Sequence, residues 1–464
     1  MTDLFRLSAV ETASAIARRD VSVTEVTQAH LARVAAVDGA VNAVVEPMAE
    51  AALADAAAKD AGRPDDLPDL WGVPITIKIN VDLQGYPNSN GIPALNKGAA
   101  TADSPVVANL KAAGAVVIGR SSAPEFSLRW FTSNPIYGVS LNPWDKTLTP
   151  GGSSGAAAAA VATGMGCLGH GNDLGGSLRY PAYACGLATL RPSLGRVPAF
   201  NPSAADERAA VLQAMSVQGV IARNIGDVQA TLPALSRGDW RDPQWRVSPG
   251  EWPRARRVGV CVDPFGDGVE AEVVSAVLAG AEAAREAGYE VVEVTVPRAV
   301  DAAVTWGELL NAEMEETLLE SIKEMGSAGI NRVTEGFVEA FGRPDRAAFI
   351  AAQARRITLQ RDWAGMFRDI DALILPPSSA VPFRNDQDFL EPETIPDIIA
   401  AQRVLCIINL LGLPAASVRT TDDRPVPLGV QVVGPMMGDE TCLDVAAGIE
   451  RALGFDLRPI DPQV

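Results

Sequence analysis

The chain has 464 residues, 47% of them apolar, so it is long enough and apolar enough to fill a sizeable hydrophobic core. Its net charge is −18 and it has no run rich in lysine and arginine, which argues against nucleic acid as a partner. No uncharged apolar stretch of about eighteen residues is present, and the N-terminus carries acids where a signal peptide would carry a basic patch, so we expect a cytoplasmic protein without membrane contact.

The supply of cysteine and histidine limits the chemistry that the chain can perform. The cysteines are odd in number, scattered and never spaced as C-x-x-C, so neither disulfides nor a zinc site is expected. They are Cys167, Cys185, Cys261, Cys406 and Cys442. Of the two histidines, His30 lies in a helical pattern and is interpreted as structural, so a Ser-His-Asp triad would have to use His170. We expect no metal and no cofactor.

The N-terminal segment, about residues 1–65, is predicted to be helical. Ser8 with Glu11, and Ser22 with Glu25, have the spacing of capping boxes, in which a serine caps a helix whose third residue is a glutamate. The alanine-rich run at about 42–61 continues the helical pattern.

Further along, the pattern changes to strands. "GVPITIKIN" alternates isoleucine with polar residues, which predicts a strand with one polar side from which Lys78 projects. "DSPVVANLKAAG" predicts a helix capped by Asp103 or Ser104, with Pro105 in its first turn, that ends at Gly114. The strand "AVVIG" follows and completes half of a βαβ unit.

The same alternation returns in the second half of the chain. "RVGVCV", "EVVEVTV" and "DALILP" are predicted strands, and a helix at about 269–287 ends at Gly288. We therefore expect an α/β fold: a large mixed, mostly parallel twisted sheet covered by helices on both faces. The segment at about 301–369 is predicted to be helical and to cap the sheet edge. No linker stands out, so residues 1–464 are interpreted as one domain.

Two glycine-serine stretches raise the question of function. "TPGGSSGAAAAAVATG", residues 149–164, is either a flexible linker or a loop that holds backbone and hydroxyls in place. It has no lysine after its glycines, so it is not a phosphate-binding loop. In "HGNDLGGSLRYPAYACG", residues 170–186, Ser177 follows two glycines, and such small residues let backbone N–H groups turn inward beside the hydroxyl. Acyl transfer needs this pairing of a nucleophile with amides that receive the oxyanion. Serine needs a base, and with histidine so scarce lysine is the natural candidate.

Three blocks together resemble the amidase signature family. They are "GVPITIK" with Lys78, "TPGGSSG" with Ser153 and "NDLGGSLRYPAYACG" with Ser177, separated by 75 and then 24 residues. The likeness extends through "SPVVANLKAAGAVVIGRSSAPEF" and weakly to "DALILPP", "LGLPAASV" and "PLGVQVVGP". The resemblance implies the amidase signature fold, with a signature core at about 66–230.

The resemblance also implies a Ser-cisSer-Lys triad and no cofactor. Ser177 matches the nucleophile, Lys78 matches the general base, and Ser153 matches the serine that follows a cis peptide bond and relays the proton. The oxyanion hole would be formed by the amides of Leu174, Gly175, Gly176 and Ser177. The positions that match supporting or substrate-binding residues are Ser127, Ser154, Asp173 and Arg179.

Several residues depart from the usual family pattern. Ile79 stands where an aspartate usually follows the lysine, which removes a carboxylate and helps to keep the Lys78 amine neutral; Ala156 and Leu174 replace a glycine and a threonine. Asn172 is expected to line the site. His170 is expected to buttress the loop, with a catalytic part as the alternative.

The expected reaction is hydrolysis of an amide, anilide or carbamate C–N bond through an acyl-enzyme on Ser177. The chain looks most like free-standing bacterial amidases that accept aryl amides or carbamates, with esters as a side activity. The aromatic residues of "EFSLRWFTSNPIYG" either line the substrate pocket or belong to the core; they are Phe126, Trp130, Phe131 and Tyr137. Two alternatives stay open: the glutamine-hydrolysing subunit of a tRNA-dependent amidotransferase, and a non-catalytic relative. The expected partner is a small-molecule amide or carbamate, and the assembly considered is a homodimer.

Overall fold

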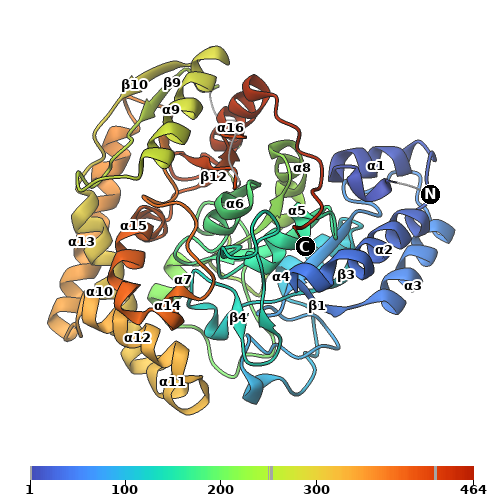
Figure 1. Cartoon of the computed structure of the whole chain (residues 1–464), viewed down its shortest axis with the longest axis horizontal. Helices are drawn as coiled ribbons and strands as arrows, with labels where there is room; N and C mark the ends of the chain where they lie inside the picture. The colour runs from blue at the N-terminus through green and yellow to red at the C-terminus, as the bar shows by residue number, and fades with distance from the viewer. Residues whose placement is uncertain (1–2, 249, 251–253, 423–425, 464) are drawn as a thin grey trace.

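A single eleven-stranded sheet forms the centre of the protein, in the order β1-β3-β2-β6-β8-β7-β12-β13-β11-β9-β10 (Figure 1). The computed structural model describes residues 3–248, 250, 254–422 and 426–463. The strands of this sheet are β1 (Val44–Pro47), β2 (Pro74–Lys78), β3 (Val116–Ser121), β6 (Leu168–Asp173), β7 (Ala188–Arg191), β8 (Val217–Ala222), β9 (Arg257–Val260), β10 (Glu290–Glu293), β11 (Ala372–Leu375), β12 (Ala415–Arg419) and β13 (Gly429–Val433). A separate short pair is formed by β4 (Ser133–Asn134) and β5 (Gly138–Val139).

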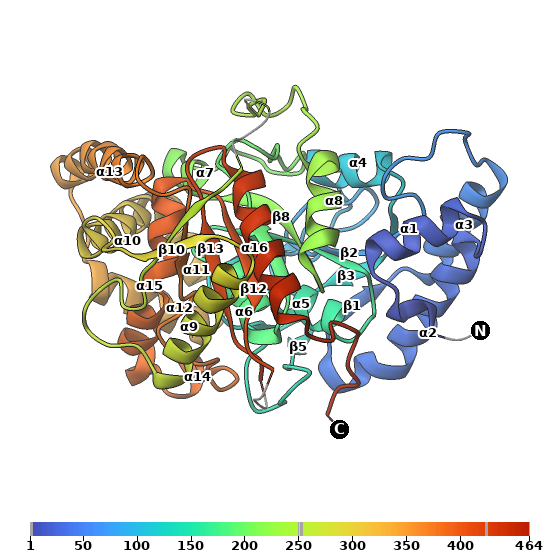
Figure 2. The same cartoon turned by 90° about the horizontal axis from the view of Figure 1, so that it is seen from above.

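Helices cover both faces of the sheet. They are α1 (Ala9–Ala17), α2 (Val23–Val41), α3 (Ala49–Ala61), α4 (Pro105–Ala112), α5 (Gly155–Ala162), α6 (Arg179–Cys185), α7 (Ala210–Met215), α8 (Ile225–Leu235), α9 (Ala271–Glu286), α10 (Ala299–Thr317), α11 (Leu319–Met325), α12 (Ala328–Phe341), α13 (Arg346–Met366), α14 (Gln387–Leu390), α15 (Ile395–Leu411) and α16 (Asp439–Leu453). Helices α4, α8, α9 and α16 pack over one face, and α5, α6 and α15 lie over the other. The N-terminal helices α1–α3 lie at one end of the sheet and α10–α13 at the other (Figure 2).

The predicted α/β class, with a mixed sheet and helices on both faces, is confirmed. Among the described strands, parallel pairing occurs at the two flanks, β3-β2-β6 and β11-β9-β10, whereas every pair from β6 to β11 is antiparallel. A crossover is needed to return a chain parallel to its neighbour, and helices supply it at the flanks: α4 lies between β2 and β3 along the chain, and α9 lies between β9 and β10.

The helical N-terminal segment is interrupted by one strand. Both capping boxes are present: Ser8 Oγ accepts from the Glu11 amide at 3.1 Å, and Ser22 Oγ accepts from the Glu25 amide at 3.1 Å. The prediction that helix continues through 42–61 is wrong for Val44–Pro47, which pairs with β3. Asn42 ends α2 in a left-handed conformation, with φ 52°, and the following valines suit a strand.

The segment predicted as a helical cap at 301–369 contains α10–α13, and α10 packs against α15. Of the described residues, one helical segment, Pro392–Leu411, is long and apolar enough to span a bilayer. Within the molecule 72% of its apolar window is buried, as is expected for a core helix.

Glu450 on α16 gives a pH-dependent contribution to stability. Its carboxylate accepts from the amide of Ile225 at the start of α8, at 2.9 Å. Burial, with the nearby charge of Asp227, raises the pKa of Glu450 from 4.5 to about 7. A raised pKa means that the folded state binds the proton more tightly, so this contribution is complete below about pH 4.5 and is lost as the pH rises through 7.

We therefore expect Glu450→Gln to keep the acceptor and remove the penalty of the charge. The variant should exceed the wild type in free energy of unfolding by up to about 3 kcal/mol at pH 8.5 and match it near pH 5. Urea unfolding at the two pH values checks this. An equal difference at both would contradict the assignment.

Candidate active site

Lys78 lies at the end of β2 with its side chain fully buried. Its Nζ is 2.7 Å from Ser153 Oγ, 3.1 Å from Ser154 Oγ and 2.9 Å from Asn172 Oδ1. Burial lowers the pKa of the Lys78 ammonium well below its usual value, although the charge of Asp173 acts in the opposite direction. The predicted polar side of this strand therefore faces the protein interior rather than solvent. This burial favours the neutral form of the Lys78 amine.

The loop before α5 is buried and fixed, so the linker interpretation is wrong. The peptide bond between Gly152 and Ser153 is cis, as the family resemblance implied. A Cβ on Gly152 would overlap the backbone of Phe131, so a side chain does not fit there. Thr132 Oγ1 donates to the carbonyl of Gly151 at 2.9 Å. The fully buried alanine helix α5 follows and packs against β6.

Ser177 lies in the turn between β6 and α6, with 7% of its surface exposed. Within the described residues its hydroxyl has no hydrogen-bond partner, and it faces a cavity. Gly176 has φ 104°, and a Cβ there would overlap the side chain of Leu405. Position 176 thus requires glycine, because its backbone has a positive φ and because no room is left for a side chain.

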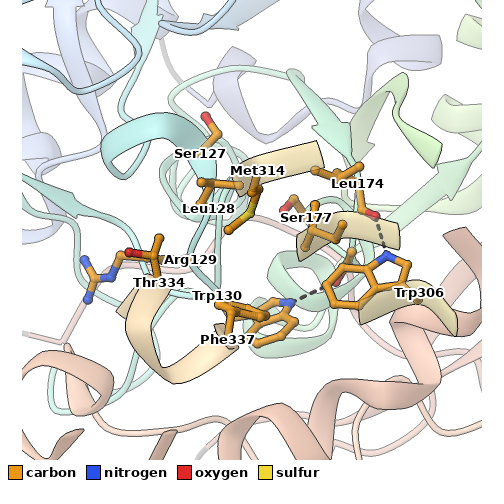
Figure 3. A pocket seen from close by; sticks show the side chains of 12 residues that line it. Ser127, Leu128, Arg129, Trp130, Leu174, Ser177, Trp306, Met314, Thr334 and Phe337 are labelled. Carbon is orange, nitrogen blue, oxygen red and sulfur yellow. Dashed lines mark hydrogen bonds between the residues drawn. The ribbon is translucent and has the colours of Figure 1, made fainter. Parts of the chain in front are cut away.

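The amide groups of this turn differ in their availability. The N–H of Gly176 donates to Asp173 Oδ1 at 2.8 Å, so it is engaged, contrary to the expectation that it forms part of the oxyanion hole. The predicted amides of Leu174, Gly175 and Ser177 have no such bond within the described residues. The carbonyl groups of Gly175 and Leu174 accept from the indole N–H groups of Trp130 and Trp306, at 2.8 and 3.4 Å (Figure 3).

Asp173 and Arg179 form a buried ion pair that braces the turn. Arg179 donates to Asp173 through Nε and Nη2, both at 3.0 Å, and both side chains are fully buried. Asn409 donates to Asp173 Oδ1 at 2.9 Å. Burial alone would raise the pKa of Asp173, but the charges of Arg179 and Arg191 hold it well below its usual value.

Within the described residues, neither histidine forms a hydrogen bond to the hydroxyl groups of the site. His170 on β6 is fully buried, with Nε2 3.1 Å from Gln218 Oε1 on β8, and burial lowers its pKa to about 3. Among the described contacts it has no hydrogen bond to Ser153 or Ser177, which favours the buttressing role over the catalytic one. His30 is buried beside Cys167, as the structural interpretation predicts. No group of three or more His, Cys, Asp or Glu in the described part of the chain is arranged to hold a metal.

A cavity with two lobes opens at Ser177. The apolar lobe has an empty volume of about 430 Å³, including its opening to solvent. Its lining residues are Ser127, Leu128, Arg129, Trp130, Leu174, Gly175, Ser177, Trp306, Leu310, Met314, Thr334 and Phe337 (Figure 3). The polar lobe has a volume of about 980 Å³ on the same measure, and both lobes are lined by Ser127, Leu128, Leu174 and Ser177. Its amide side chains are Asn80, Asn90, Asn172, Asn201 and Gln218.

The predicted aromatic loop contributes only in part. Trp130 lines the apolar lobe and Phe126 the polar lobe. Phe131 packs against Phe383 in the core, and Tyr137 donates to Glu46 away from the cavity. Most of the remaining apolar wall comes from the helices α10 and α12, which the sequence placed in a cap without indicating that they face the site.

The fold and this site define an amidase. Residues 25–443 match the family model Amidase, and the chain belongs to that family of enzymes, which hydrolyse amide C–N bonds. It is 39% identical to an indoleacetamide hydrolase of Bradyrhizobium diazoefficiens over 97% of this chain and 87% of the relative. It is 31% identical to one subunit of the glutamyl-tRNA(Gln) amidotransferase of a Synechococcus strain, over 93% of this chain and 94% of the relative. A bacterial aryl acylamidase of the amidase signature family has a similar structure, with a TM-score of 0.84, 25% identity and 97% of each chain covered.

Proposed function

We propose that the chain hydrolyses aryl amides through an acyl-enzyme on Ser177, with Ser153 and Lys78 as proton relay. The observation that carries this proposal is that the buried Lys78 amine lies 2.7 Å from Ser153 Oγ, and that Ser153 and Ser177 line the same cavity. Neutral Lys78 accepts the proton of Ser153, which accepts that of Ser177 as the latter attacks the carbonyl carbon. The relay then returns the proton to the leaving nitrogen. Water, deprotonated by the same relay, releases the acid.

The turn before Ser177 supplies electrostatic stabilisation of the developing oxyanion. We assign this role to the amides of Leu174, Gly175 and Ser177, because Asp173 engages that of Gly176. Each such donor contributes about 2.7–4 kcal/mol in enzymes of this type of chemistry. No charged side chain is needed for this step.

The apolar lobe supports an aryl group as the acyl side of the substrate. Trp130, Trp306 and Phe337 surround it, and offset or edge-on contacts with a ring are favourable there. The likeness to an indoleacetamide hydrolase points to the same class, a primary amide joined to an aromatic ring through a short spacer. The net charge of −18 supports our further proposal that the enzyme acts on small molecules and not on nucleic acid. We also propose a cytoplasmic location. A homodimer is the assembly that we propose to test.

A substrate panel tests the function directly. We expect arylacetamides to be hydrolysed with the highest kcat/KM, ahead of anilides, carbamates, esters and glutamine. Preference for glutamine would favour the alternative of a glutamine-hydrolysing subunit of an amidotransferase. Failure of all compounds, together with failure of a fluorophosphonate to label Ser177, would favour the non-catalytic relative.

Phe337→Ala tests whether the apolar lobe holds the substrate ring. Phe337 lies on α12 and lines the lobe without a hydrogen bond to the turn at Ser177. Loss of its contact with a substrate ring should raise KM for an arylacetamide by roughly 10- to 100-fold, since burying such a side chain contributes about 1.5–3 kcal/mol. The KM for acetamide should change little. A thermal melt confirms that the variant is folded, and an equal rise in both KM values would contradict the assignment.

A further inference from the structure

A continuous chain of hydrogen bonds runs from Lys78 to the wall of the cavity. Lys78 Nζ donates to Asn172 Oδ1 at 2.9 Å, and Asn172 Nδ2 donates to Asn80 Oδ1 at 3.0 Å. Asn80 Nδ2 donates to Ser127 Oγ at 2.9 Å, which donates to Asn90 Oδ1 at 2.7 Å. Every donor in this chain points away from Lys78, so the amide dipoles are aligned.

The network fixes which way the Asn172 amide faces. The reverse orientation would place the Asn172 oxygen against Asn80 Oδ1, where neither atom is a donor, so this hydrogen bond would be lost. The far end of the chain is held by the backbone. Asn90, Phe126 and Ser127 have φ values of 45°, 55° and 57°, and such left-handed positions in non-glycine residues cluster at functional sites.

The number of hydrogens on a neutral amine determines where the lone pair of Lys78 can point. A neutral Lys78 has two N–H bonds and one lone pair, whereas three acceptors surround its nitrogen. If Ser154 and Asn172 take the two hydrogens, the lone pair is left to face Ser153. The orientation that the proton relay requires then follows from the positions of the other two oxygens.

We infer that Asn172 is a positioning residue, which aims the lone pair of Lys78 at Ser153 and is itself held by the chain through Asn80, Ser127 and Asn90. This inference rests on the proposed function. Asn172 combines an acceptor with electrical neutrality, so it binds the amine without favouring the ammonium form.

The charged and titratable groups that face Lys78 leave this role to Asn172. Asp173 is the carboxylate whose charge acts on Lys78, and it is already paired with Arg179. His170 is buried and bound to Gln218. Ile79, which replaces the usual aspartate after the lysine, offers no charge.

Asn172→Asp tests the inference because it keeps the shape and adds a charge about 2.9 Å from Nζ. The carboxylate should stabilise the ammonium, and an opposite charge at this range shifts a pKa by about 1–3 units. We expect the rate of Ser177 labelling by a fluorophosphonate to fall at least tenfold at pH 7.5. The midpoint of its rise with pH should move upward by about one unit or more. The pH profile of arylacetamide hydrolysis should move in the same direction.

Asn90→Asp is the matched control. It adds the same charge to the other end of the chain, four hydrogen bonds from Lys78, and keeps the acceptor for Ser127. Its midpoint should move clearly less. A slower Asn172→Asp with the midpoint of the wild type, or an equal shift in both variants, would overturn the inference. Failure of the wild type itself to be labelled on Ser177 would instead overturn the proposed function.

Discussion

Ser177→Ala should lower the turnover of an arylacetamide by about 10⁵-fold or more, because the variant lacks the atom that attacks the carbonyl in the mechanism that we propose. Removal of a serine nucleophile from a triad costs a rate of this order, and what remains comes from the oxyanion hole and binding. The fold should be unaffected, since the hydroxyl has no hydrogen-bond partner within the described residues and faces the cavity.

Two measurements check this expectation. Steady-state kinetics give the residual rate, and intact-protein mass after fluorophosphonate treatment should show one adduct on the wild type and none on the variant. Ser275→Ala, an exposed serine on α9, is the control and should behave as the wild type in both. Residual turnover above a few per cent would show that another group is the nucleophile.

Asp173→Asn should cause the largest loss of stability among the site variants. It leaves the fully buried Arg179 without its carboxylate, and breaking a buried ion pair in this way costs about 3–5 kcal/mol. The amide that replaces the carboxylate also loses an acceptor for the Gly176 N–H or for Arg179. Activity should fall as well, because the turn that carries Ser177 is no longer braced.

The pH dependence of this loss has a defined sign. Arg179 and Arg191 hold the pKa of Asp173 below its usual value of 3.8 against the effect of burial, so the contribution is complete above that value and is lost as the pH falls below it. Urea unfolding should therefore show a gap between wild type and variant that is constant near neutral pH and narrows only in strong acid. Glu282→Gln, which breaks the exposed pair with Arg285, should cost less than about 1 kcal/mol. A cost of that size for Asp173→Asn would contradict the role of the ion pair.

The sequence predicted those parts of the molecule whose pattern is local. The capping boxes at Ser8 and Ser22 need only four consecutive residues, and the alternation around Lys78 is visible within one strand. The three motif blocks are far apart in the sequence, and the prediction that Lys78, Ser153 and Ser177 meet in space came from the family resemblance. That the polar face of β2 is enclosed could not be predicted, because α5 and β6 cover it only in the folded chain.

The parts that the sequence did not predict depend on the three-dimensional arrangement of the folded chain. The apolar wall combines Trp130 with Trp306 and Phe337, and nothing in the sequence around α10 and α12 indicates a cavity. Gly176 was expected to offer its amide to the substrate, but Asp173 takes it through the geometry of one turn. Asn172 lines the cavity as expected, but its bond to Lys78 could not be predicted because it depends on the pairing of β2 with β6.

The two indole N–H bonds to the turn before Ser177 have a consequence for how this enzyme can diversify. Trp130 and Trp306 form the walls that a substrate ring would touch, and they also anchor the carbonyls of Gly175 and Leu174. A change at either tryptophan would therefore alter substrate range and catalytic rate together. Phe337 packs against both indole rings, whereas Leu310 and Met314 line the same lobe without a bond to the turn, so new selectivity can evolve, or be engineered, at these two positions with the smallest effect on the catalyst.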